Sequence, residues 1–175
     1  MLIRSSSAPE NLERLREGKK RMKEACMQLA LANTPATVEL VVIRRRLSGA
    51  ADYCGKVLIV PRPVTRRAVH VFLHELAHIV LGHFEGKYTA DYQAEAAAER
   101  WATAKMRAAG IPVSRRNIQG GKQYVARKIW QALYDGCEVD PKVRRWAVSG
   151  VDKAKWKEAL TRIPRPTPIK GPVFV

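Results

Sequence analysis

Hydrophobic positions recur at helical spacing in three long stretches of the chain, with charged residues between them in the first and many alanines in the third. Residues that end helices follow each stretch: Asn33-Thr34-Pro35 after the first, Gly82 after the second and Gly110 after the third. These patterns predict three helices, over Pro9–Ala32, Val64–Leu81 and Asp91–Ala109.

Two segments between the first and second of these helices have the composition of strands. Thr37–Ile43 is β-branched and partly alternating, and Lys56–Val60 is a short apolar run stopped by Pro61 and Pro63. The mostly polar residues from Arg44 to Gly49 are predicted to be a connection. Long helices beside a small sheet predict an α+β fold.

The last third of the chain differs from the rest in charge and in element length. Residues 103–175 hold 16 basic and 5 acidic side chains. Three short helices are predicted over about Lys122–Tyr134, Pro141–Val148 and Asp152–Leu160, followed by an extended proline-rich tail. We therefore predict a first domain over residues 1–110 and a basic helical appendage over residues 111–175.

Overall composition is that of an ordinary globular protein, except for charge. Of 175 residues 46% are hydrophobic, but 32 basic and 16 acidic residues leave a net charge of +16, which attracts anionic partners. No stretch has the length and polarity of a signal peptide or a membrane span. The three cysteines Cys26, Cys54 and Cys137 are odd in number and far apart, which argues against disulfides. We expect a cytoplasmic protein without membrane association.

All four histidines lie within fourteen residues, and the central pentapeptide His74-Glu75-Leu76-Ala77-His78 has the form HExxH. Residues four apart on a helix share one face, so both imidazoles can reach the same metal ion. Glu75 follows the first ligand and projects beside the ion, where it can accept a proton from a bound water. The pattern predicts a Zn²⁺ site held by His74 and His78, with Glu75 as general base. The alternative is an apolar helix with core histidines, which would leave costly buried polar groups.

A catalytic zinc needs a third protein ligand and an open position. His83 is one candidate, but the three-histidine pattern HExxHxxGxxH fails because Leu81 and Phe84 occupy its glycine and histidine positions. Glu95 and Glu99 are the others, four apart on the following helix and therefore on one face of it. The residue pattern alone leaves the three open.

The segment HELAHIVLGH, a short loop and YQAEAAAERWA together resemble the ImmA/IrrE-type metallopeptidases and related small gluzincins. The resemblance covers about residues 37–109. It implies a zincin-like core, a small sheet packed on the HExxH helix, and Glu95 as the third metal ligand, with Glu99 as the alternative. It also implies that Lys56–Val60 is the edge strand that binds an extended peptide substrate.

The roles of several neighbouring side chains are left open by the sequence. A donor is needed near the oxyanion of the transition state, and Tyr88, Tyr92 and His83 are candidates. His70 lies one turn before His74 and is either a partner of a ligand or a surface residue.

The basic C-terminal third carries aromatic residues, including Trp130, Trp146 and Trp156, among its charges. These residues either contact nucleic acid or anchor short helices on the core. We expect a zinc metallopeptidase that cleaves protein or peptide substrates, among them DNA-associated proteins. One alternative is a nucleic-acid-binding module of a mobile element or phage with a non-catalytic zincin scaffold; another is a structural or inhibitory partner of an acidic protein.

Overall fold

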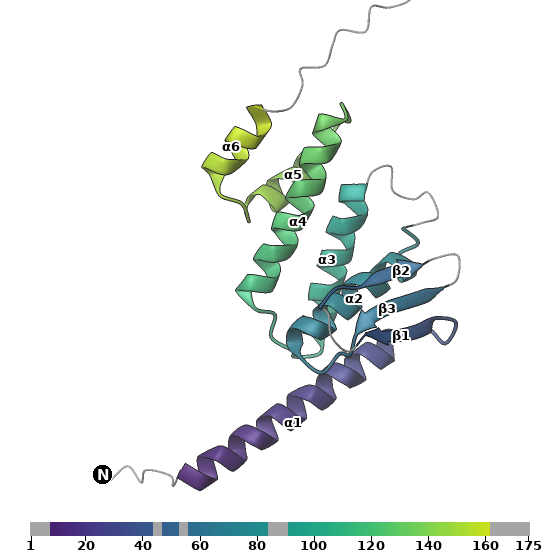
Figure 1. The fold of residues 1–175 in the computed structure, drawn as a ribbon, viewed down its shortest axis with the longest axis vertical. Helices are drawn as coiled ribbons and strands as arrows, with labels where there is room; N and C mark the ends of the chain where they lie inside the picture. The colour runs from purple at the N-terminus through teal and green to yellow at the C-terminus, as the bar shows by residue number, and fades with distance from the viewer. Residues whose placement is uncertain (1–7, 44–46, 53–55, 84–90, 162–175) are drawn as a thin grey trace, which may run out of the picture.

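The computed structural model describes residues 8–43, 47–52, 56–83 and 91–161 (Figure 1). Within these ranges it contains six helices and three short strands, so the predicted α+β class is confirmed. The elements in chain order are α1 (Ala8–Asn33), β1 (Glu39–Ile43), β2 (Ala50–Asp52), β3 (Val57–Pro61), α2 (Arg66–Val80), α3 (Asp91–Ala108), α4 (Arg115–Tyr134), α5 (Pro141–Val148) and α6 (Lys153–Thr161).

The sheet has the order β1-β3-β2, with β1 parallel and β2 antiparallel to β3. The expectation that Lys56–Val60 forms an edge strand is therefore wrong: β3 is the central strand, paired on one side through Val41 and Ile59 and on the other through Ala51 and Leu58. The sequence pattern missed β2, because Ala-Ala-Asp is short and lacks β-branched side chains.

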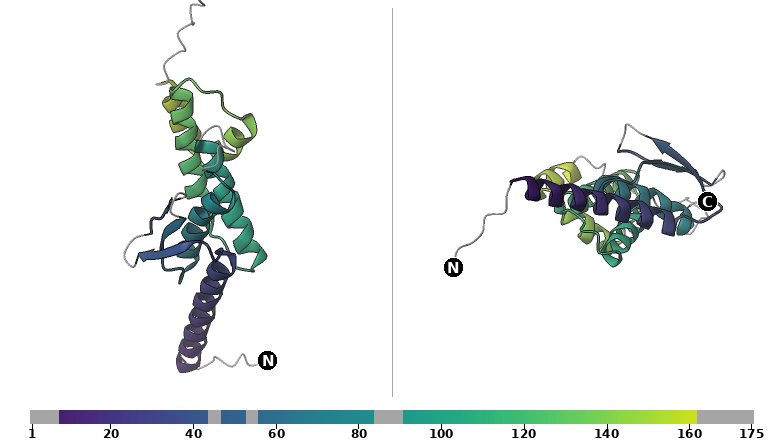
Figure 2. Two further views of the ribbon diagram at one scale, coloured as in Figure 1. Left: turned by 90° about the vertical axis from the view of Figure 1, so that its right-hand side faces the viewer. Right: turned by 90° about the horizontal axis from the view of Figure 1, so that it is seen from below.

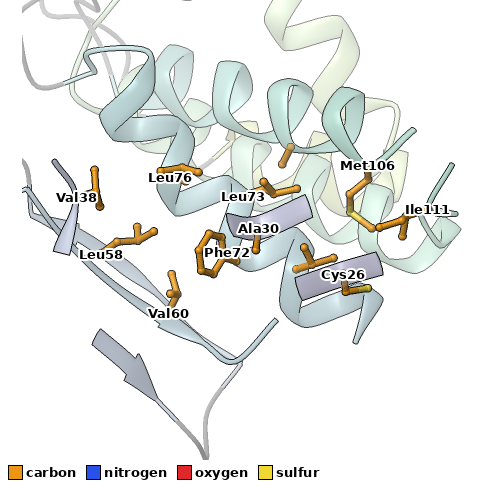
Figure 3. Packing of buried hydrophobic residues seen from close by; sticks show 12 residues of the cluster. Cys26, Ala30, Val38, Leu58, Val60, Phe72, Leu73, Leu76, Met106 and Ile111 are labelled. Carbon is orange, nitrogen blue, oxygen red and sulfur yellow. The ribbon is translucent and has the colours of Figure 1, made fainter. Parts of the chain in front are cut away.

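One hydrophobic core joins the sheet to the helices around it (Figure 3). Leu58 and Val60 of β3 meet Phe72 of α2, and the last turns of α1 close the cluster with Cys26 and Ala30. The buried members are Cys26, Ala30, Val38, Leu58, Val60, Val69, Phe72, Leu73, Leu76, Ala102, Met106 and Ile111. This core fixes the position of the HExxH helix.

A second core lies between the N-terminal half of α3 and the C-terminal helices. Tyr92 and Ala96 of α3 pack there with Val125 and Ile129 of α4 and with Ala147 of α5. Since α3 contributes to both cores, the helices after residue 110 are joined to the first part of the molecule through a shared element. The division at residue 110 stays a prediction.

Helix α4 begins at Arg115, several residues before the predicted start at Lys122. Ser114 caps it by accepting a hydrogen bond from the Asn117 backbone N–H at 3.1 Å. The consecutive glycines Gly120 and Gly121 lower helix propensity, which concealed this first part from the sequence pattern. The other predicted helices agree with the structure to within about two residues.

Helix α1 extends away from the rest of the molecule (Figure 2). Its second half is packed, whereas Leu12 and Leu15 in its first half are 52% and 62% exposed. None of the helices in the described ranges has both the length and the apolar character needed to cross a membrane. The proline-rich tail, Cys54 and Tyr88 lie outside the described residues; Cys26 is buried and Cys137 exposed, both as free thiols.

Candidate metal centre

The two motif histidines lie on one face of α2, which begins at a capped end. The Thr65 hydroxyl accepts a hydrogen bond from the Ala68 backbone N–H at 3.1 Å. His74 and His78 follow one turn apart, as their spacing requires, and their Nε2 atoms are 3.3 Å apart. Neighbours on the opposite face of α2, among them Leu73 and Leu76, are fully buried in the core, so the helix cannot rotate.

Helix α3 brings Glu95 to these two imidazoles. Its Oε2 atom lies 3.0 Å from Nε2 of His74 and 3.5 Å from Nε2 of His78. His74, His78 and Glu95 together form a group that could hold a metal ion. The small residues around Glu95 permit this approach, because Ala94, Ala96 and Ala98 are buried where α3 packs.

The spacing of the three atoms matches a zinc site. Zinc binds nitrogen and oxygen at about 2.0–2.2 Å, so two ligands of a tetrahedral ion lie roughly 3.4 Å apart. The three separations here, 3.0, 3.3 and 3.5 Å, cluster around that value. Two imidazoles and a carboxylate suit zinc and also several other divalent transition metals.

Glu99 lies behind His74 and apart from the three grouped atoms. Its Oε1 is 3.2 Å from Nδ1 of His74, and its Oε2 is 3.5 Å from Nε2 of His70. The His74 contact is within ion-pair range, although it is not aligned as a hydrogen bond. A carboxylate at the outer nitrogen of a ligating histidine fixes the ring and makes it more basic. Of these two glutamates, only Glu95 belongs to the group that could hold a metal ion.

Helix α4 packs against the Glu99 carboxylate at Gly121. A Cβ atom added at Gly121 would collide with the Glu99 carboxylate, so this carboxylate would have to shift if the glycine were replaced. His70 is 6% exposed and lies 3.4 Å from the Thr103 hydroxyl, which makes it a buried neighbour of Glu99 and excludes a surface position.

His83 contacts the outer nitrogen of the second motif histidine, His78. Its Nδ1 lies 2.9 Å from Nδ1 of His78, directly after the end of α2. Burial lowers the pKa of His83 to about 4, so its ring is neutral at pH 7. Nδ1 of a neutral His83 can accept a hydrogen bond from an N–H at Nδ1 of His78. In that arrangement Nε2 of His78 is available to a metal.

Contacts within the group formed by His74, His78 and Glu95 shift the pKa values of His74 and Glu95 in opposite directions. Burial alone would lower the pKa of His74, but the contacts with Glu95 and Glu99 outweigh it and raise that pKa to about 10. Contacts with His74 and His78, against the opposing effect of burial, hold the pKa of Glu95 well below its usual range. A proton on His74 therefore supplies the positive charge that a metal ion would bring.

Glu75 lies beside the group and under the strand segment that leads into β2. A Cβ atom at Gly49 would meet the Glu75 side chain, so the backbone before β2 passes directly over this carboxylate. Burial raises the pKa of Glu75, opposed by the neighbouring histidines. A carboxylate with a raised pKa is a better proton acceptor at neutral pH.

Tyr124 of α4 is a member of the site that the sequence analysis did not single out. Its hydroxyl donates a 3.2 Å hydrogen bond to Oε1 of Glu95, and its ring lies edge-on to that of His74. Burial and the nearby Glu95 raise the pKa of Tyr124 to about 12, so the phenol keeps its proton. Tyr92, one of the three candidates from the sequence, instead accepts a hydrogen bond from the Asp140 backbone N–H and supports α5.

No protein-family model, no curated protein and no solved structure matches this chain. The case for a function rests on the side chains just described.

Proposed function

We propose that this protein is a zinc-dependent metallopeptidase with a zincin-like core, in which His74, His78 and Glu95 bind the metal. The observation that carries the proposal is the separation of the three ligand atoms, 3.0 to 3.5 Å. Two of these atoms belong to the HExxH motif of α2 and the third to Glu95 of α3. Bound zinc would supply a Lewis acid that lowers the pKa of water to about 7.

Glu75 is the general base of this proposal. It is adjacent to the first ligand, half-buried, and has a raised pKa, so it accepts a proton from water and returns it to the leaving amine. Tyr124 is the donor to the carbonyl oxygen as negative charge develops there, and its single O–H would leave Glu95 to do so. The Tyr124 phenol keeps its proton and is already hydrogen-bonded to Glu95, a member of the metal group.

An extended peptide is the substrate that the sheet favours. β2 is an edge strand, and the backbone before it passes over Glu75 at Gly49. A peptide added to β2 would form main-chain hydrogen bonds with little dependence on side chains and would place a peptide bond beside the general base. This function of β2 replaces the one first expected of Lys56–Val60.

The basic surface of the last helices supports nucleic acid as a second partner. Lys142, Arg144 and Arg145 of α5 are exposed, as are Lys153, Lys155 and Lys157 of α6. The acidic residues Asp140 and Asp152 on these helices cap their N-termini. Such a surface would bring the peptidase to DNA-associated proteins, or serve as the whole function if the core is not catalytic.

Hydrolysis of an unstructured protein such as casein, or of a peptide library, tests the catalytic proposal. Zinc-loaded wild type should cleave, and the E75Q variant should bind zinc equally and lose at least about 10³-fold in rate, since the base is lost. The conservative variant E158Q on α6 is the matched control. Equal turnover by zinc-loaded E75Q would exclude Glu75 as the base.

A further inference from the structure

A hollow of about 600 Å³ lies next to the metal group, between the first turns of α2 and the first half of α4. Arg67 and His70 of α2, Arg116 and Gly120 of α4, and Glu99 of α3 contribute to its lining. None of the three residues that could hold a metal lines it. The hollow is therefore a separate site that meets the metal group only through Glu99.

Two guanidinium groups from different helices give the hollow its charge. Arg67 and Arg116 are both exposed, and neither forms an ion pair with another residue in the described part of the chain. Glu99 is the one acidic residue in the lining, and its two oxygens already face His74 and His70. One carboxylate, 11% exposed and beneath Gly121, against two guanidinium groups leaves the lining with a net positive charge.

The rest of the lining is polar and not aromatic. The amide side chains of Asn117, Gln119 and Gln123 add hydrogen-bond donors and acceptors to the two guanidiniums. Guanidinium groups match the planar oxygens of carboxylates and phosphates and bind them with two parallel hydrogen bonds. The volume is within the range of about 300–1,000 Å³ typical of small-molecule sites and exceeds what one inorganic ion fills.

We propose that this hollow binds a small anionic molecule, whose phosphate or carboxylate group is held by Arg67 and Arg116. The amides would bind the polar remainder of the molecule. The proposal does not depend on peptidase activity, because neither the hollow nor its arginines take part in the metal group.

Titration of the full chain with inorganic phosphate, followed by calorimetry or NMR at physiological ionic strength, tests the proposal. We expect saturable binding that is weakened at least about tenfold in R67Q/R116Q, since two charge-assisted contacts are lost. The control R107Q/R127Q removes the same charge from exposed positions of α3 and α4 outside the hollow and should bind as wild type. Equal weakening in both double variants would overturn the proposal.

A second pair of variants fills the hollow without removing an arginine. Gly120 lines it, and a Cβ atom there would meet nothing within 4 Å, as is also true of Gly18 on α1. G120E places a carboxylate beside the arginines and should abolish phosphate binding, whereas G18E, with the same change of charge, should not. Equal binding by the two variants would contradict the site.

Parallel titration with succinate distinguishes the two acidic groups. Tighter phosphate binding would point to a phosphorylated ligand and tighter succinate binding to a carboxylate, and either supports the site if R67Q/R116Q weakens it. Binding of neither anion would count against it.

Discussion

The Tyr124 hydroxyl donates a hydrogen bond to Oε1 of Glu95, while Oε2 of the same carboxylate faces the two histidines at 3.0 and 3.5 Å. The two oxygens of Glu95 therefore have different partners, Oε1 the phenol and Oε2 the histidines. Because Tyr124 belongs to α4 and Glu95 to α3, the site depends on the packing of the C-terminal helices against the HExxH region.

Replacing Tyr124 with phenylalanine should lower kcat for peptide hydrolysis about 10²-fold or more, with little change in KM. An oxyanion donor acts only in the transition state, and removing one costs on this order. Steady-state kinetics on a fluorogenic peptide would measure the effect. Y134F, at the exposed end of the same helix, is the control and should resemble wild type. A kcat unchanged by Y124F would exclude Tyr124 as the donor.

Alanine at Gly121 and alanine at Gly120 should have opposite effects on stability. In a helix interior, glycine to alanine stabilises by about 0.5–1 kcal/mol where space permits, as it does at Gly120. At Gly121 the new methyl group would collide with the Glu99 carboxylate, and a destabilisation of about 1–3 kcal/mol is expected.

Urea denaturation of the two variants, with wild type alongside, measures the difference. Metal affinity should also fall in G121A, because a displaced Glu99 no longer orients His74. If G121A were as stable as G120A, the close contact between α4 and Glu99 would not exist in solution.

Zinc binding should release a proton and strengthen as pH rises. In the metal-free protein, burial would lower the pKa of His74, but the contacts with Glu95 and Glu99 outweigh burial and raise that pKa to about 10. The ring is therefore protonated at pH 7. A metal binds only the neutral imidazole, and the proton must leave. Lowering the pH therefore weakens binding, by up to about tenfold per pH unit for one proton.

Calorimetric titration of zinc in two buffers with different ionisation enthalpies gives the number of protons released. The expected value is close to one at pH 6.5, from His74, and rises toward two by pH 8, because water on the zinc would ionise with a pKa of about 7. An enthalpy independent of the buffer would show that His74 is neutral before the metal binds.

Local patterns in the sequence predicted the parts of the site that one helix determines. The spacing of His74 and His78 was sufficient to place both imidazoles at one point, because four residues make about one helical turn. Likewise the apolar periodicity predicted α2 and α3 to within about two residues at each end. The choice of Glu95 over Glu99 needed a family resemblance, since both lie on the same face of α3.

Contacts between distant segments could not be predicted in this way. Tyr124 contacts Glu95 across 29 positions of sequence. Gly49 lies close to Glu75 just before β2, a strand too short to have a recognisable pattern. The consecutive glycines at 120 and 121 weakened the helical pattern of α4, although Gly121 is where α4 packs against Glu99. A charged hollow such as that of Arg67 and Arg116 exists only after α2 and α4 are packed together.

The metal content of the full chain tests the central claim most directly. After purification with added zinc and removal of the excess, elemental analysis should find about one zinc per chain in wild type and in the control E138Q. H78A and E95A should lose the metal, and E99Q should retain it with affinity reduced about 10- to 100-fold, since Glu99 contacts the outer nitrogen of His74 and does not belong to the metal group. Wild type without zinc, or E95A with a full equivalent of it, would contradict the site described by His74, His78 and Glu95.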